Sequence, residues 1–342
     1  MRHRIIPRTT INISEIGFGC WTMGGPNWNL QNGSPIGWAN VNEEDLVAGI
    51  KVGLDHGVNH WDNADVYGNG VAERRLGNAF RKLGVDRASQ VIATKVGHFR
   101  GTAANAYEPT HIRRQCEQSL ANLRTDHIDL YYFHHGTFTG PDYDGREHDY
   151  LHEAAATMHA LVKEGKVRAI GQSAYSVEDF ARAIPIVKPN VLQSKANLRV
   201  REMVTTGSAL HALMVKHDCA FVAFGPLDQG ILLDKFDPEN PPKFEGEYRE
   251  NRRDFNAETL RDTRARLAQA AEKFGARQPG RNRVELLSSL AQRWLLAQDR
   301  VCSVIPGFRN AGQAACNVAA AKDEPMSAED AAWLRKVFEG SR

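Results

Sequence analysis

The feature that most constrains the fold of this chain is a regular alternation of short β-branched runs with longer amphipathic segments. We expect eight strands, at Glu15–Phe18, Val58–Asp62, Gln90–Lys95, Ile128–His134, Val167–Gln172, Val191–Ser194, Ala220–Phe224 and Val301–Ile305. Helical periodicity predicts helices at Glu43–His56, Ala72–Leu83, Thr110–Leu123, Leu151–Glu164, Val177–Ala183, Met203–His217, Val284–Ala297 and Ala311–Ala321. Repeated β-then-α units in one chain predict a (β/α)₈ barrel, an α/β fold.

Two segments fall outside these units. Met1–Ile13 has two short apolar runs around Pro7-Arg8-Thr9-Thr10, which predicts a hairpin that closes the barrel floor. The charged stretch from Leu233 to about Arg283 is an insertion between the seventh strand and its helix, and two interpretations of it stay open. It is either a solvated insertion or a functional loop over the mouth of the barrel. Nothing in composition marks a second domain, so we expect one domain over residues 1–342.

Composition excludes several classes of function. The net charge of +2, with both signs interspersed, predicts no surface for nucleic acid or for a membrane. No apolar run approaches the roughly 20 residues that a membrane-spanning helix needs. The five cysteines lie far apart and include no Cys-x-x-Cys pair, which is typical of reduced thiols inside the cell. We therefore expect a cytoplasmic protein that acts on a small molecule.

Four reactive side chains stand at the ends of successive predicted strands. Asp62, Lys95 and His134 end strands two, three and four, and Tyr67 lies in the loop after the second. The carboxyl ends of barrel strands open on one face, so these groups should converge. A phenol is a weak acid at neutral pH, but an ammonium lowers its pKa and a carboxylate holds the ammonium in place. With a histidine to orient the oxygen and a nicotinamide to supply hydride, the set predicts a carbonyl reductase.

Each of these residues alone has an ordinary explanation, as a turn former, a packing residue or a surface charge. A different reaction class uses the same fold, because His60 and Asp62 with Lys95 and His134 could begin the metal site of a barrel hydrolase. The ends of strands five, six and eight offer only poor further ligands, at Gln172-Ser173, Ser194 and Pro306-Gly307. We therefore expect no metal.

With these residues assembled, the chain resembles the aldo-keto reductase family, NAD(P)H-dependent carbonyl reductases with a (β/α)₈ barrel and no metal. The resemblance runs nearly end to end, through Gly17-Phe18-Gly19-Cys20-Trp21, Asp62-Asn63-Ala64-Asp65-Val66-Tyr67-Gly68, Thr94-Lys95, Ser119-Leu120, Ile128-Asp129-Leu130-Tyr131, Gly165-Lys166-Val167-Arg168, Ile170-Gly171 and Val304-Ile305-Pro306-Gly307. It implies that Tyr67 is the proton donor, that Lys95 and Asp62 tune it, and that His134 orients the carbonyl.

The resemblance also implies the cofactor contacts. Phe224 would stack on the nicotinamide, and Ser173 and Gln193 would bind its carboxamide. The full set that it implies is Trp21, Asp62, Ser173, Gln193, Phe224, Gly225, Pro226, Leu227, Gln229, Gly230, Lys235, Gly307, Arg309, Gln313 and Asn317. The chain has no Gly-x-Gly-x-x-Gly motif, and phosphate sites of barrels gather at the loops after strands seven and eight.

We expect NADPH to be preferred, with NADH possible, because Arg309 could pair with the 2′-phosphate. Lys235, Arg249, Arg252 and Arg253 add charge if the insertion folds over the cofactor.

Three residues depart from the family pattern: Ala174 replaces Asn, Ala196 replaces Tyr and Cys316 replaces an acid. All three affect cofactor contacts rather than the reacting groups. Some relatives of this fold, such as potassium-channel β-subunits, act as regulatory nucleotide-binding partners, but the complete set of four side chains favours an enzyme. An aldehyde or ketone pocket could be walled by Trp21, Met23, Trp28, Trp38, His98, Phe99 and Phe138.

Overall fold

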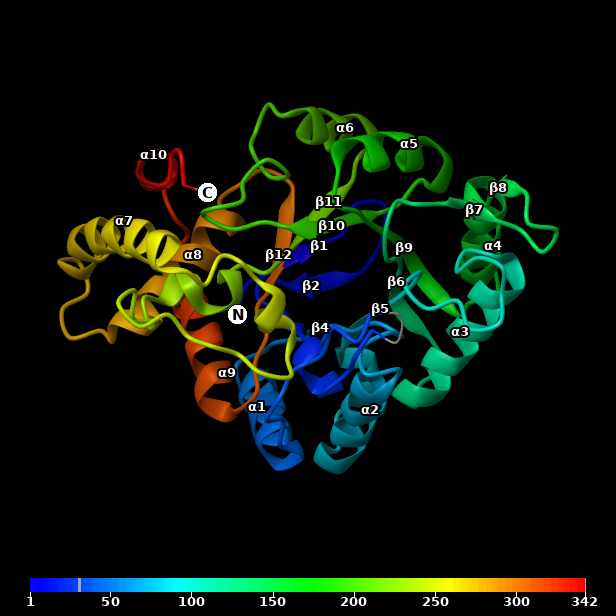
Figure 1. The fold of residues 1–342 in the computed structure, drawn as a ribbon, viewed down its shortest axis with the longest axis horizontal. Coiled ribbons are helices and arrows are strands. Elements are labelled where there is room, and N and C mark those ends of the chain that lie inside the picture. Colours follow the sequence, from blue (N-terminus) through cyan, green and yellow to red (C-terminus); the bar gives the residue numbers. More distant parts are fainter. Residues whose placement is uncertain (30–31, 342) are drawn as a thin grey trace.

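The computed structural model describes residues 1–29 and 32–341. Within them, eight parallel strands form one sheet in the spatial order β12-β11-β10-β9-β6-β5-β4-β3. The strands are β3 (Phe18–Gly19), β4 (His60–Asp62), β5 (Val91–Val96), β6 (Ile128–Phe133), β9 (Val167–Ser173), β10 (Val191–Lys195), β11 (Ala220–Phe224) and β12 (Val301–Ile305). Backbone bridges from Ile16 to Val304 and from Gly19 to Gly307 bring the two edges together. The predicted (β/α)₈ barrel is confirmed (Figure 1).

Helices surround the strands, and most match the predicted segments within two residues. They are α1 (Glu43–Asp55), α2 (Val71–Leu83), α3 (Pro109–Leu123), α4 (Leu151–Lys163), α5 (Val177–Val187), α6 (Ala209–His217), α8 (Arg283–Leu296) and α9 (Ala311–Val318). Polar caps set several starts, as where the Asn42 side chain accepts the Asp45 N–H.

Three predicted boundaries are wrong for identifiable reasons. Helix α5 continues past Ala183 through Pro185, because the fully buried Ile184 and Val187 hold it against the core. Helix α6 begins at Ala209 rather than at residue 203, since Ser208 caps it. The first barrel strand is Phe18–Gly19, because Glu15 instead accepts hydrogen bonds from Arg2 and Arg4.

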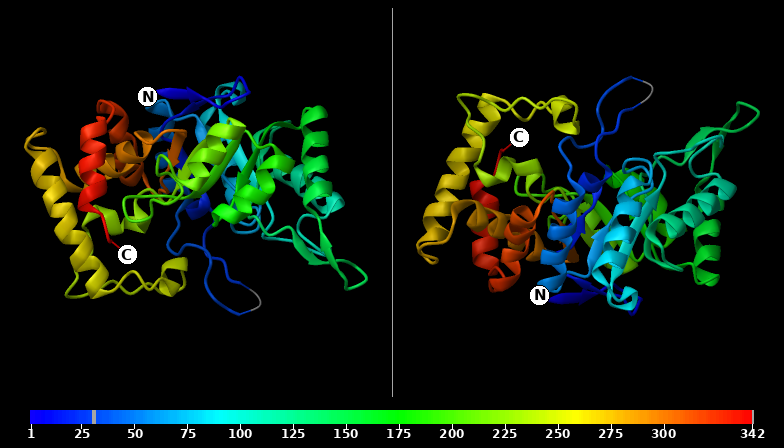
Figure 2. Two further views of the ribbon diagram at one scale, coloured as in Figure 1. Left: turned by 90° about the horizontal axis from the view of Figure 1, so that it is seen from above. Right: turned by 90° about the horizontal axis from the view of Figure 1, so that it is seen from below.

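The floor of the barrel is closed as predicted. Strands β1 (His3–Ile5) and β2 (Asn12–Ser14) pair in an antiparallel hairpin. Ile13 of β2 and the flanking Ile6 and Ile11 are buried in one cluster with strand residues such as Leu130 and Tyr132. This seals the interior with apolar side chains at the amino ends of the strands. Figure 2 shows the hairpin at one end of the molecule and the long loops at the other.

The prediction missed three elements. Within the insertion lies a 19-residue helix, α7 (Ala257–Gly275), whose Leu260, Leu267 and Phe274 are buried, so the insertion is not simply solvated. A hairpin of β7 (Thr139–Pro141) and β8 (Glu147–Asp149) follows β6, and a helix α10 (Ala328–Val337) closes the chain. Short 3₁₀ helices are η1 (Trp21–Gly24), η2 (Arg87–Ser89), η3 (Asp228–Leu233), η4 (Tyr248–Asn251) and η5 (Ala319–Lys322).

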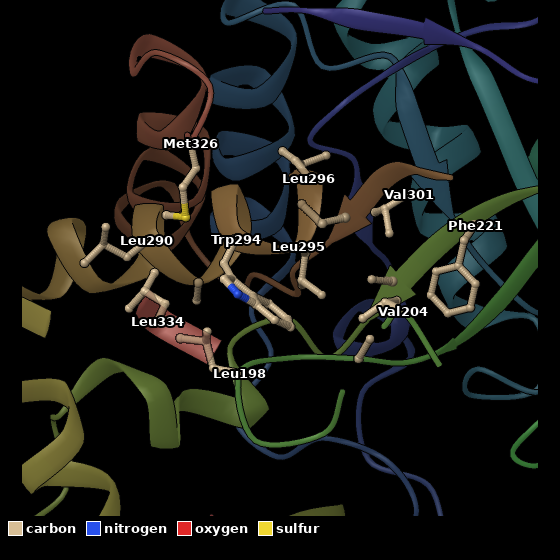
Figure 3. Packing of buried hydrophobic residues seen from close by; sticks show 14 of the residues in the cluster. Leu198, Val204, Phe221, Leu290, Trp294, Leu295, Leu296, Val301, Met326 and Leu334 are labelled. Carbon is tan, nitrogen blue, oxygen red and sulfur yellow. The ribbon is translucent and has the colours of Figure 1, made fainter. Parts of the chain in front are cut away.

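The largest apolar cluster explains how the added helices are held. Trp294 of α8 packs with Val301 of β12 and Phe221 of β11, and Leu334 of α10 covers the same cluster from outside (Figure 3). This packing fixes the wall from which the loops after β11 and β12 emerge. In the described part of the chain, no helix has the length and apolar character to cross a membrane.

Candidate active site

The structure brings the four predicted catalytic side chains together at the carboxyl ends of the strands. The Lys95 Nζ lies 2.6 Å from Asp62 Oδ2 and 3.4 Å from the Tyr67 hydroxyl. The Tyr67 and His134 rings meet edge to face, with centroids 5.9 Å apart. These contacts follow from register, because Asp62 pairs with Ala93 and Lys95 pairs with Tyr132 in adjacent parallel strands.

Asp62 and Lys95 form a buried ion pair whose side chains are 3% and 1% exposed. The backbone carbonyl of Asn63 accepts a second hydrogen bond from Lys95 at 2.6 Å, and Gln193 donates to the other oxygen of Asp62 at 2.8 Å. Such additional bonds are what makes burial of two charges tolerable. Both oxygens of Asp62 are thus engaged. Among the described residues, no three His, Cys, Asp or Glu side chains converge as metal ligands would.

The proton-donating capacity of Tyr67 rests on its phenol staying protonated. Burial, followed by the charge of Asp62, raises the pKa of Tyr67 well above 10.0. The net pKa is therefore raised rather than lowered as expected, because burial and Asp62 outweigh the Lys95 ammonium 3.4 Å from the phenol, which by itself favours the phenolate. Tyr67 therefore carries its proton at neutral pH.

His134 is a neutral imidazole. Burial, then the neighbouring His98 and Lys95, lowers the pKa of His134 well below 6.5. Its Nδ1 is buried and has no hydrogen-bond partner among the described residues. A proton on a buried, unpaired Nδ1 is disfavoured, so we assign the single ring proton to Nε2. In that tautomer His134 can donate a hydrogen bond.

The residues assigned to the nicotinamide lie at the ends of β9, β10 and β11. Ser173 and Gln193 are buried, whereas Phe224 is half-buried and meets Tyr175 edge to face at 6.3 Å. Because the Gln193 amide already donates to Asp62, it also holds that carboxylate in place. The sequence analysis missed Tyr175, which is 60% exposed beside this position. A tyrosine just past a strand end was its only signal.

Part of the insertion crosses the mouth of the barrel. The Tyr248 backbone N–H donates to the Gly37 carbonyl at 2.9 Å, and the Tyr248 ring meets Trp21 at 4.6 Å. Trp21 in turn stacks on Tyr67, with centroids 6.1 Å apart. Figure 2 shows this segment, in yellow, approaching the blue loop after β3. For this stretch the structure favours the interpretation as a loop over the mouth.

Not every predicted wall residue faces the mouth. Met23 and Phe138 are fully buried and Trp38 is 8% exposed, so these three pack the loops. The remaining wall candidates keep accessible surface: Trp21, Trp28, His98 and Phe99.

Cations gather around Asp228, which lies in the loop after β11. The fully buried Asp228 forms ion pairs with Lys195, Arg199 and Arg252, and Arg252 also binds Asp254. Burial alone would raise the pKa of Asp228, but Lys195 and Arg199 outweigh it and the pKa is lowered. Three cations thus face two carboxylates. The sequence analysis named only Arg252 of these cations, and Lys195 at the end of β10 was the missed signal.

This loop also turns through left-handed backbone. Asp228, Gln229 and Gly230 all have positive φ, at 44°, 55° and 99°. The loop after β11 contains all of the predicted stretch Gly225, Pro226, Leu227, Gln229 and Gly230.

A second cluster of cations lies at the loop after β12. The Arg309 guanidinium is 3.7 Å from Glu247, which also pairs with Arg249. Burial, then the charges of Arg249 and Arg309, lowers the pKa of Lys235. Glu247 is the carboxylate that Arg249 and Arg309 share, and Lys235 lies near enough to both arginines for their charges to lower its pKa. Arg249 itself lies over the Phe244 ring at 3.9 Å, so it is fixed in place.

The other predicted cofactor residues of this region support the loop after β12. The Gln313 side chain accepts the Arg309 N–H at 3.0 Å, and the Asn317 amide donates to the Gly307 carbonyl at 3.1 Å. Of the three departures from the family pattern, Ala174 and Ala196 are fully buried and Cys316 is half-buried. The backbone of Ala174 still takes part in the site, because its carbonyl accepts the Ser194 hydroxyl at 2.6 Å.

Comparison with known proteins gives a consistent match over the whole barrel. The family model described as "Aldo/keto reductase family" matches residues 15–339. A probable voltage-gated potassium channel subunit beta from Arabidopsis thaliana is 26% identical over 95% of this chain and 93% of its own length. The NADH-specific methylglyoxal reductase of Escherichia coli is 26% identical over 97% and 96%. The structure of a glycerol dehydrogenase from Gluconobacter oxydans superposes with a TM-score of 0.76 at 24% identity, covering 99% of this chain and 95% of that one.

Proposed function

The chain belongs to the aldo/keto reductase family of oxidoreductases, and from this premise we propose that it reduces an aldehyde or ketone to an alcohol with NADPH. One observation carries the proposal. Tyr67, Lys95 and Asp62 form a connected line at the open end of the barrel, and the neutral His134 lies beside Tyr67. This arrangement offers a protonated phenol and an imidazole donor to one oxygen atom.

The chemistry follows from these protonation states. A bound nicotinamide supplies hydride to the carbonyl carbon. Tyr67 donates its proton to the carbonyl oxygen, which completes the alcohol and leaves a phenolate. Lys95, 3.4 Å from the phenol oxygen, stabilises that charge, and Asp62 keeps the ammonium in position. His134 donates a hydrogen bond from Nε2 to the same carbonyl oxygen and holds it toward Tyr67.

The cationic loops fit a nucleotide with phosphate groups. The side chains around Asp228 carry an excess of positive charge at the end of β10 and β11, where we place the pyrophosphate. The cluster of Lys235, Arg249 and Arg309 offers more cations than Glu247 neutralises, and we place the 2′-phosphate there. A ribose hydroxyl cannot pair with these charges as a phosphate does.

The experiment is the oxidation of NADPH and NADH against a panel of aldehydes and ketones, together with dissociation constants for both nucleotides. Arg309→Ala should weaken NADPH binding by about tenfold to a hundredfold, the range for a charge-assisted hydrogen bond, with little change for NADH. Arg261→Ala is the matched control, because Arg261 is an exposed arginine of the same insertion that pairs with Glu239 instead. Equal loss for both nucleotides in Arg309→Ala would remove this assignment of the 2′-phosphate.

A regulatory, non-catalytic role is the second candidate, because the similarity to a probable channel subunit beta covers the whole chain. A single measurement, turnover of a simple aldehyde, distinguishes the two roles. An enzyme turns over a simple aldehyde many times for each active site, whereas a nucleotide-binding subunit releases NADPH unchanged. The connected Tyr67, Lys95 and Asp62 side chains favour turnover.

A further inference from the structure

The loop after β5 fixes a second imidazole beside His134. The His98 ring lies 4.3 Å from the His134 ring and 5.0 Å from the His135 ring. The loop is tied down on both sides of His98, because His135 Nε2 binds the Gly97 carbonyl at 2.9 Å and His111 Nε2 binds the Phe99 carbonyl at 2.7 Å. His98 is therefore held at the carboxyl end of β5 rather than carried on a free loop.

His98 differs from its neighbours in the hydrogen bonding of its ring nitrogens. His135 uses Nε2 toward Gly97, and its Nδ1 accepts the Thr137 N–H at 3.2 Å. Across residues 1–29 and 32–341, neither ring nitrogen of His98 has a hydrogen-bond partner. The residue is also exposed at the mouth, whereas His134 is 6% exposed. His98 thus presents free polar atoms to the space in front of His134.

The charge of His98 limits what it can bind. Burial of part of the ring, then the charges of His135 and Lys95, lowers the pKa of His98 to about 4. At neutral pH the ring offers one N–H donor and one acceptor and carries no charge. Such a group suits a hydroxyl or carbonyl oxygen of a substrate better than a carboxylate.

We propose that His98 is a specificity-determining residue that binds an oxygen on the carbon next to the reacting carbonyl. The preferred substrates would be 2-hydroxy aldehydes, 2-hydroxy ketones or 1,2-dicarbonyl compounds. This inference rests on the proposed carbonyl reduction, in which His134 holds the reacting oxygen.

Two distances support this choice. Oxygens on adjacent carbons are closer together than the 4.3 Å between the two ring centres, so each imidazole edge can reach one of them. The Trp21 ring stacks on Tyr67 with centroids 6.1 Å apart and offers an apolar surface to the carbon skeleton. A substrate that reacts at Tyr67 therefore has a polar side toward His98 and an apolar side toward Trp21.

The test compares three aldehydes of the same chain length with NADPH: propanal, 2-hydroxypropanal and 3-hydroxypropanal. His98→Phe keeps an aromatic ring and removes both nitrogens, His98→Gln restores a donor and an acceptor, and Thr102→Ala is the control at an exposed residue of the same loop. The measured quantity is kcat/KM of each variant relative to wild type for each aldehyde, so differences in aldehyde hydration cancel.

In His98→Phe we expect the preference for 2-hydroxypropanal over propanal to fall by roughly tenfold, the upper range for one neutral hydrogen bond. The value for propanal should stay near wild type, and His98→Gln should recover part of the preference. Thr102→Ala should leave the ratio unchanged. An unchanged ratio in His98→Phe, or an equal fall for 3-hydroxypropanal, would overturn the inference. If wild type reduced none of the aldehydes, the proposed function would fail instead.

Discussion

Replacing Tyr67 by phenylalanine separates the catalytic hydroxyl from the packing of its ring. The ring contacts Trp21 at 6.1 Å and His134 at 5.9 Å, and both contacts persist in the variant. The hydroxyl has one long hydrogen bond, 3.4 Å from Lys95 Nζ. Its removal should change the free energy of unfolding by no more than about 0.5–1.5 kcal/mol. The variant should therefore fold and bind nucleotide almost as wild type does.

The rate should respond far more strongly. Loss of a general acid lowers turnover by about 10²–10⁴-fold, which corresponds to roughly 2.7–5.4 kcal/mol in the activation barrier. Turnover of a simple aldehyde, NADPH affinity and urea unfolding would be measured on the same preparation. Tyr132→Phe is the matched control, because its hydroxyl is buried without a partner among the described residues and 6.0 Å separates its ring from Lys95 Nζ. If Tyr67→Phe kept more than about a tenth of wild-type turnover, the assignment of the proton donor would be wrong.

Three further predictions concern the same site. Lys95→Met leaves the buried Asp62 unpaired, so we expect it to lose activity and about 3–5 kcal/mol of unfolding free energy. Any residual pH profile of Lys95→Met should move to higher pH. The double variant Asp62→Asn/Lys95→Met should recover stability in urea but not turnover. Tyr67 has a pKa raised above 10.0 and His134 one lowered below 6.5, so kcat/KM for reduction should be flat between these values and fall only where Tyr67 deprotonates or His134 protonates; an inflection inside the interval would show that another group controls the reaction. Turnover should survive EDTA, because Asp62 is engaged by Lys95 and Gln193, and loss that zinc restores would revive a metal mechanism.

The barrel could be predicted from sequence because its strands and helices are local patterns. Apolar runs such as Ala220–Phe224 and Val301–Ile305 were located to the residue, and strand order followed from the repeated unit. The convergence of Asp62, Lys95 and His134 was predictable for the same reason, since parallel strands place their carboxyl ends on one face.

What the sequence did not reveal depends on contacts between distant segments. The path of the insertion is set by pairs such as Tyr248 with Gly37 and Arg252 with Asp228, which no local pattern encodes. The direction of the Tyr67 pKa shift was missed because it depends on opposing effects. Asp62 holds the Lys95 ammonium at 2.6 Å, and burial of the phenol has the largest effect on its pKa. The sequence can identify the residues of such a network, but it does not give the distances between them that determine their pKa values.

Burial and hydrogen bonding distinguish the residues of this site that tolerate substitution from those that do not. Asp62 and Lys95 are almost fully buried and bonded to backbone and to Gln193, so a substitution there disturbs both the barrel and the reaction. His98 and Trp21 stand on loops at the mouth and keep accessible surface, so changes there alter which substrate reaches Tyr67 without touching the ion pair beneath it. Selectivity and proton transfer are therefore expected to vary independently in this protein, and the rate on a minimal aldehyde should report the buried groups alone.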